Sequence, residues 1–103
     1  MSPATILLAE DEEPVRRLLV ELLRSAGYCV LAAGSGAEAL AMAAEHPQPI
    51  ALLVTDVAMP AMNGAELARR LQEKQSGTRV LFISGYSQAG ALDALAEQPG
   101  FQY

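Results

Sequence analysis

The sequence of 103 residues has no tryptophan, one cysteine, and charged side chains at only 18% of its positions. The lone cysteine, Cys29, cannot form an internal disulfide, and its apolar neighbours predict a small core residue in a reducing compartment. No apolar run approaches the roughly 20 residues that a membrane-spanning helix needs, and no basic-then-apolar leader opens the chain. We therefore expect a cytoplasmic protein with no membrane partner.

Basic residues are scarce as well, because 7 Lys and Arg side chains stand against 12 Asp and Glu, for a formal net charge of −5. Since a phosphate backbone requires a basic surface, we expect no direct binding to nucleic acid. A hydrophobic content of 51% excludes a disordered chain, and the length predicts a single domain over residues 1–103. The basic side chains on predicted helices are interpreted as solvated faces: Arg16, Arg17, Arg24, Arg69, Arg70 and Lys74.

Hydrophobic periodicity predicts an alternation of strands and helices. Short apolar runs, typical of strands buried on both faces, are found at residues 5–9, 28–33, 50–55 and 79–83. Helical spacing of apolar residues is found at 14–26, 36–46 and 65–74. A weaker helix is predicted at 89–97, and a fifth strand begins at 101–103. Strands separated by helices pair in parallel through right-handed crossovers, so we expect a three-layer α/β sandwich.

Local signals define the ends of two of these helices. Pro14 suits a first helical turn, and Gly27 marks the end of the same helix. Ser35, with Glu38 three residues later, forms a capping box that predicts the start of the second helix.

Acidic and hydroxyl side chains directly follow three of the predicted strands. Glu10 and Asp11 come after the first strand, Asp56 after the third, and Ser84 after the fourth. Parallel α/β sheets bind ligands beyond the carboxyl ends of their strands, so we expect these side chains to lie close together. Clustered carboxylates need a counter-charge, and their oxygens suit Mg²⁺. A carboxylate can also act as a nucleophile and form an aspartyl phosphate, whose oxygens would accept a hydrogen bond from the Ser84 hydroxyl.

Each part of this set has a simpler explanation when it is taken alone. The run from Glu10 to Glu13 could be an acidic helix entrance, Asp56 could cap a turn, and Ser84 could begin an ordinary loop. The coincidence of three complementary parts at three strand ends favours the functional interpretation. Periodicity alone leaves open which metal binds and whether phosphate does.

Three segments, in the right order and at the right spacing, carry a resemblance to a known family. They are Ile6 to Glu12 (ILLAEDE), Asp56 to Gly64 (DVAMPAMNG) and Val80 to Tyr86 (VLFISGY). The chain resembles the receiver domains of response regulators and hybrid histidine kinases over essentially its whole length. This resemblance implies a flavodoxin-like fold with strand order 2-1-3-4-5.

The resemblance also implies a role for each matching residue. Asp56 would be the phosphoacceptor, and Glu10 and Asp11 would be the acidic pair, with Asp11 a direct ligand of Mg²⁺. The backbone carbonyl of Ala58 would be a further metal ligand. Gly64, with Pro60 before it, would shape the loop that enters the third helix.

The end of the chain departs from the family pattern. By resemblance, Ser84 would be the switch hydroxyl and Tyr103 the aromatic switch residue. The family places a lysine after the fifth strand and then a fifth helix, whereas the sequence stops at Tyr103, before both. Lys74, the only lysine, lies on a predicted helix and cannot replace it. We therefore expect a C-terminally incomplete receiver domain whose last helix is missing.

Three functions remain open at this point. The first is a phosphorelay switch that receives its phosphoryl group from a histidine kinase or a histidine phosphotransfer protein, and that catalyses only its own phosphorylation and dephosphorylation. The second is a degenerate receiver that acts only as a protein-interaction module, with a homodimer among its possible forms. The third is a phosphatase with an aspartate nucleophile, but such an enzyme would want an acid two residues later, where Ala58 stands.

Overall fold

The structure is a computed structural model, and it describes residues 3–83 of the chain. The predicted helix at 89–97, the predicted strand at 101–103, and the candidate residues Ser84 and Tyr103 lie outside the described residues. Strands and helices alternate throughout, in the order β1 (Thr5–Ala9), α1 (Glu13–Ser25), β2 (Cys29–Ala33), α2 (Gly36–Glu45), β3 (Leu52–Thr55), α3 (Gly64–Lys74) and β4 (Arg79–Phe82).

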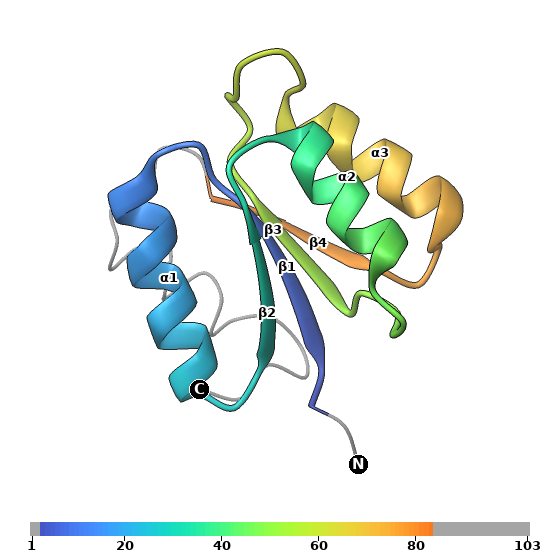
Figure 1. Ribbon diagram of the computed structural model, residues 1–103. Coiled ribbons are helices and arrows are strands. Elements are labelled where there is room, and N and C mark those ends of the chain that lie inside the picture. Colours follow the sequence, from blue (N-terminus) through green and yellow to red (C-terminus); the bar gives the residue numbers. More distant parts are fainter. Residues whose placement is uncertain (1–2, 84–103) are drawn as a thin grey trace.

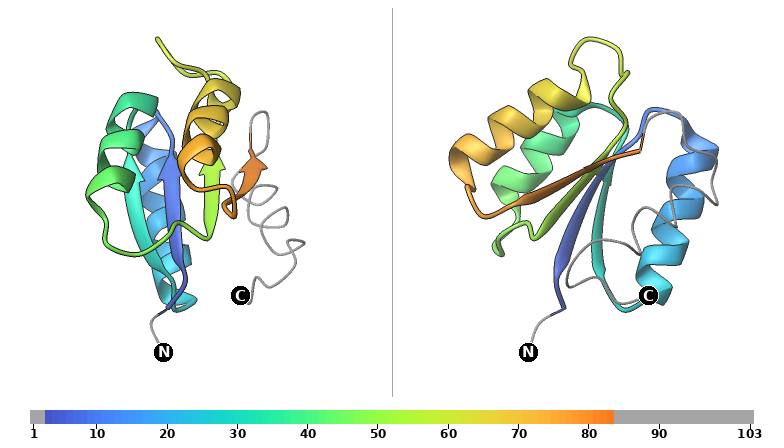
Figure 2. Two further views of the ribbon diagram at one scale, coloured as in Figure 1. Left: turned by 90° about the vertical axis from the view of Figure 1, so that its right-hand side faces the viewer. Right: turned by 180° about the vertical axis from the view of Figure 1, so that it is seen from behind.

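The described strands form one parallel sheet in the order β2-β1-β3-β4. Helix α1 lies on one face, and α2 and α3 lie side by side on the other (Figure 1). The view from behind shows the same three layers (Figure 2). The predicted sandwich is therefore confirmed, and the order of the four strands is the one that the family resemblance implies. No helix among residues 3–83 is long and apolar enough to cross a membrane.

The central strand β1 is buried on both faces, as its continuous apolar run predicts. Because side chains alternate along a strand, Ile6 and Leu8 pack with α1, while Leu7 and Ala9 pack with α2 and α3. Burying a large apolar side chain stabilises a fold by roughly 1.5–3 kcal/mol. These two clusters of buried side chains, one on each face, hold the helices on the sheet. The candidate site lies at the carboxyl ends of its strands.

The helix ends follow the local signals in the sequence. Pro14 occupies the first turn of α1, and Gly27 follows this helix with a φ of 98°, a conformation that glycine adopts at little cost. At α2, the Ser35 hydroxyl accepts a hydrogen bond from the Glu38 amide at 3.2 Å. Helix α3 has an equivalent cap that the sequence analysis missed, in which the Asn63 side chain accepts from the Glu66 amide at 2.8 Å.

Strand β3 is shorter than predicted, because it begins at Leu52 rather than at residue 50. The backbone of Ile50 is bonded elsewhere: its N–H donates to Gln75 Oε1 at 2.7 Å, and its carbonyl accepts from Thr78 Oγ1 at 2.7 Å. Both partners belong to the connection between α3 and β4. The apolar side chain of Ile50 is buried, so hydrophobicity alone could not separate this residue from the strand.

Candidate functional site

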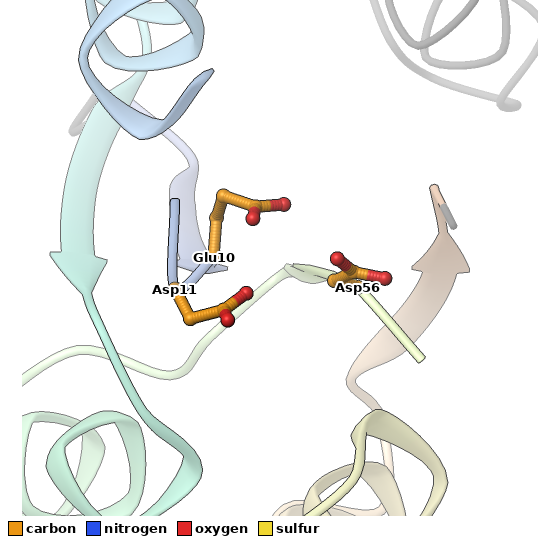
Figure 3. Close-up of side chains that lie close together, drawn as sticks. All are labelled: Glu10, Asp11 and Asp56. Atoms are coloured by element: carbon orange, nitrogen blue, oxygen red, sulfur yellow. The ribbon is translucent and has the colours of Figure 1, made fainter. Parts of the chain in front are cut away.

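Three carboxylates meet at the carboxyl edge of the sheet, as the sequence predicts. Glu10 and Asp11 follow β1, and Asp56 follows β3, which is the neighbour of β1. One carboxylate oxygen from each residue lies within 4.8 Å of the other two. In Figure 3 the side chains of Glu10 and Asp11 extend toward Asp56. Residues that are far apart in the sequence therefore form a single acidic cluster at the ends of two paired strands.

The peptide backbone at this edge is fixed by hydrogen bonds that continue the sheet beyond its strands. The Glu10 amide donates to the Ala33 carbonyl at 3.0 Å, and the Asp56 amide donates to the Ala9 carbonyl at 3.2 Å. These bonds tie the residues that follow β1 and β3 to their neighbouring strands. The carboxylates are consequently held on rigid elements, which is what a site of defined geometry requires.

Glu10 is the unusual member of the cluster, because its residue surface is only 4% exposed. Burial, together with repulsion from Asp56 and Asp11, raises the pKa of its carboxyl from 4.5 to about 7. The Glu12 amide, which donates to Glu10 Oε1 at 3.0 Å, acts in the opposite direction. Burial and the two neighbouring carboxylates therefore both disfavour the charged form of Glu10.

The donor chemistry of this cluster fits a hard divalent cation. Asp11 is exposed and Asp56 is half-buried, so a hydrated ion can approach these two residues, while Glu10 is buried. Mg²⁺ is commonly held by one or two carboxylates and keeps several waters. A cation would also relieve the repulsion that raises the Glu10 pKa. Asp11 and Asp56 are the side chains that would hold it.

The loop after Asp56 is shaped by bonds to its own first residues. The Ala58 amide donates to Asp56 Oδ1 at 3.3 Å, and the Gly64 amide donates to the Val57 carbonyl at 2.9 Å. Gly64 has no space for a side chain, since a Cβ there would lie 2.2 Å from the carbonyl oxygen of Asp56. The close approach of α3 to the Asp56 peptide therefore depends on glycine at this position.

Arg16 is a residue near the site that the sequence analysis placed wrongly. We interpreted it as part of a solvated helix face, but it is half-buried and its Nη1 donates to the Glu10 carbonyl at 2.8 Å. Arg17 does match that interpretation, because its side chain is 77% exposed. No motif in the sequence distinguishes Arg16 from the adjacent Arg17. Their different surroundings depend on which side of α1 faces the loop after β1.

The chain matches the family model described as response regulator receiver domain over residues 6–102. It therefore belongs to the receiver domain family of two-component systems, whose members are signalling modules that bind Mg²⁺ at an acidic pocket.

Particular relatives agree with this assignment. The response regulator receiver protein CpdR of Brucella abortus is 44% identical over 94 residues, which are 91% of this chain and 76% of that protein. The sensor kinase CckA of the same organism is 42% identical over 85 residues, which are 82% of this chain but only 9% of the kinase.

Solved structures carry the same fold. The receiver domain of the hybrid histidine kinase CckA superposes with a TM-score of 0.71 at 30% identity, covering 91% of this chain and 97% of that domain. A response regulator receiver domain protein of Clostridium thermocellum superposes with a TM-score of 0.74 at 29% identity, covering 90% of this chain and 71% of its own.

Proposed function

We propose that this domain is a phosphoacceptor of a two-component phosphorelay and that Asp56 takes the phosphoryl group. The observation that carries the proposal is the position of the Asp56 carboxylate, within 4.8 Å of oxygens from Glu10 and Asp11 at the carboxyl edge of the sheet. The partner would be a histidine kinase or a histidine phosphotransfer protein, consistent with the relation to sensor kinase CckA. Phosphorylation would then change the conformation of the domain.

The reaction follows from the chemistry of the Asp56 side chain. One oxygen of this carboxylate attacks the phosphorus of a phosphohistidine, so that an O–P bond forms as the N–P bond breaks and the imidazole leaves. The Ala58 amide, which donates to Asp56 Oδ1 at 3.3 Å, orients the attacking group. Phosphoryl transfer needs little more than positioning and charge stabilisation.

Mg²⁺, when bound, would neutralise negative charge on the transferring group. Asp11 and Asp56 would be its side-chain ligands, and the backbone carbonyl of Ala58 would be a third protein ligand. Glu10, being buried, would act through a water or by orienting its neighbours. Ser84 would donate its hydroxyl to a phosphoryl oxygen, and Tyr103 would be the aromatic residue that responds; both assignments rest on the family resemblance.

The test is labelling with a small phosphodonor. Incubation with acetyl phosphate and Mg²⁺ should add one phosphoryl group, detected by intact mass at neutral pH and removed by hydroxylamine. Asp56→Asn should abolish the addition, while the exposed Glu12→Gln variant serves as the matched control and should be labelled like wild type. Undiminished labelling of Asp56→Asn would exclude Asp56, and a wild type that is never labelled would favour the interaction module instead.

A further inference from the structure

Arg16, in the first turns of α1, faces the connection that carries Glu10 and Asp11. Its Nη1 donates to the carbonyl oxygen of Glu10 at 2.8 Å, and the residue is half-buried. The neighbouring Arg17 instead contacts Glu13 at 3.4 Å on the exposed side of the same helix. Two arginines of identical chemistry therefore have different surroundings, and only one of them touches the backbone of the site.

A glycine leaves room for this guanidinium. A Cβ at Gly34, in the turn between β2 and α2, would lie 3.3 Å from Arg16 Nη1, which is tighter than ordinary contact. The guanidinium thus fills the place where a side chain of that turn would stand. It joins three segments of the fold: α1, the residues after β1, and the residues after β2.

The Glu10 residue is consequently held from three directions. Its amide donates to the Ala33 carbonyl at 3.0 Å, its carbonyl accepts from Arg16, and its side-chain oxygen accepts from the Glu12 amide at 3.0 Å. The carbonyl of Glu10 belongs to the peptide unit that leads directly into Asp11. Fixing this peptide fixes the starting direction of the exposed Asp11 side chain.

We propose that Arg16 is a positioning residue for the divalent cation site, acting through the peptide between Glu10 and Asp11. The inference rests on the proposed function only in requiring that this acidic cluster binds Mg²⁺. Partners that orient metal ligands typically change metal affinity by 10–100-fold when they are removed. Removing the Arg16 hydrogen bond does not remove any of the three carboxylates. It frees the peptide that directs the Asp11 side chain toward Asp56.

The experiment measures Mg²⁺ affinity directly, by isothermal titration calorimetry and by amide shifts in NMR spectra. Arg16→Met retains an apolar stem and removes the donor, and we expect about tenfold weaker binding. Arg16→Lys restores one donor and should recover most of the affinity. Arg17→Met is the matched control, and its Kd should equal that of wild type because Arg17 is exposed and pairs with Glu13 on its own helix.

A second readout separates positioning from chemistry. In labelling with acetyl phosphate, Arg16→Met should need about tenfold more Mg²⁺ for half-maximal rate, whereas the rate at saturating Mg²⁺ should stay near that of wild type. Gly34→Ala leaves Arg16 intact but crowds its guanidinium, so it should weaken Mg²⁺ binding in the same direction and provides a test if Arg16→Met does not fold.

Distinct outcomes overturn distinct claims. An Arg16→Met protein that melts at a lower temperature but binds Mg²⁺ as wild type does would make Arg16 merely structural. Equal weakening in Arg16→Met and Arg17→Met would show a general charge effect and would also overturn the proposal. A wild type that binds no Mg²⁺ would overturn the metal site itself, and the role of Arg16 with it.

Discussion

Replacing Gly64 by alanine tests the contact between α3 and the peptide of Asp56. Gly64 is the first residue of α3 and is buried, and its added Cβ would lie 2.2 Å from the Asp56 carbonyl oxygen and 3.0 Å from its carbonyl carbon. Both atoms belong to backbone that the sheet holds in place. Because protein interiors are close-packed, relief of this clash requires a shift of about 1 Å in the helix or in the loop after β3.

The expected loss of stability depends on which atoms obstruct the new methyl group, and here they are backbone atoms. Overpacking against fixed structure costs about 1–3 kcal/mol, while alanine in place of glycine in a helix returns at most about 1 kcal/mol. We therefore expect Gly64→Ala to lower the free energy of unfolding by about 1–2 kcal/mol. The displaced Asp56 should also bind Mg²⁺ more weakly.

Gly36→Ala is the matched control. Gly36 is likewise the buried first residue of a helix, α2, but the three atoms nearest to its added Cβ all belong to the side chain of Met62, with Sδ at 2.8 Å and both Cβ and Cγ at 3.1 Å. The methionine Sδ and Cγ can rotate away and the Cβ contact at 3.1 Å needs a shift of only a few tenths of an ångström, so this variant should lose less stability than Gly64→Ala. Gly77→Ala, whose Cβ meets nothing within 4 Å, should match or exceed the stability of wild type.

Denaturant unfolding followed by far-ultraviolet circular dichroism would rank these variants, since the chain has no tryptophan to report by fluorescence. The expected order of midpoints is Gly77→Ala at or above wild type, then Gly36→Ala, then Gly64→Ala. The reasoning is refuted if Gly64→Ala is as stable as Gly36→Ala and binds Mg²⁺ with the affinity of wild type.

Three further predictions concern Glu10, Ala61 and Asn63. Since the metal-free fold raises the pKa of Glu10 from 4.5 to about 7, the free energy of unfolding should be highest below pH 4.5 and should fall as the pH rises through 7, by at most about 3 kcal/mol. Unfolding between pH 4 and 8 without metal should show this loss in wild type but not in Glu10→Gln, and parallel profiles would contradict it. Ala61 has a φ of 68°, and the amide after it donates to the carbonyl before it at 2.7 Å, the pattern of a tight γ-turn. Ala61→Gly should therefore raise the thermal midpoint, by up to about 1 kcal/mol in stability, and a lower midpoint would argue against strain there. Asn63→Ala should cost about 1 kcal/mol by removing the cap of α3, Asn63→Asp should cost little, and equal midpoints for the two would show that the cap contributes nothing.

The sequence predicted those features that depend on short-range patterns. Apolar runs predict the strand that ends at Ala9 and the strand that ends at Thr55, and parallel pairing predicts that the acidic residues directly after them meet. That expectation needs only the parallel pairing of neighbouring strands, which the alternation with helices implies. The contact of three carboxylate oxygens within 4.8 Å follows from that topology.

Features that depend on distant partners could not be predicted in this way. The start of β3 depends on bonds from Gln75 and Thr78 to the backbone of Ile50, across more than twenty residues of sequence. The burial of Arg16 depends on where α1 packs over the loop after β1 and on the missing side chain at Gly34, which leaves room for the guanidinium. A helical pattern shows which face of α1 is apolar, but it does not show which polar side chain at the border of that face will reach a backbone carbonyl.

The two explanations of the acidic run after β1 apply to different residues in the structure. Glu13 lies in the first turn of α1, is exposed, and contacts Arg17, so it is accounted for as an acidic residue at the positive end of a helix. Glu10 cannot be explained in this way, because it precedes the helix, is 4% exposed, and lies in the cluster with Asp11 and Asp56. A buried carboxylate with a raised pKa beside two others destabilises the metal-free fold. The hydrogen bond that Glu10 accepts from the Glu12 amide at the start of α1 does not require two further carboxylates beside it, whereas a cation site gains affinity from them, since the bound ion removes a repulsion that the free protein must bear.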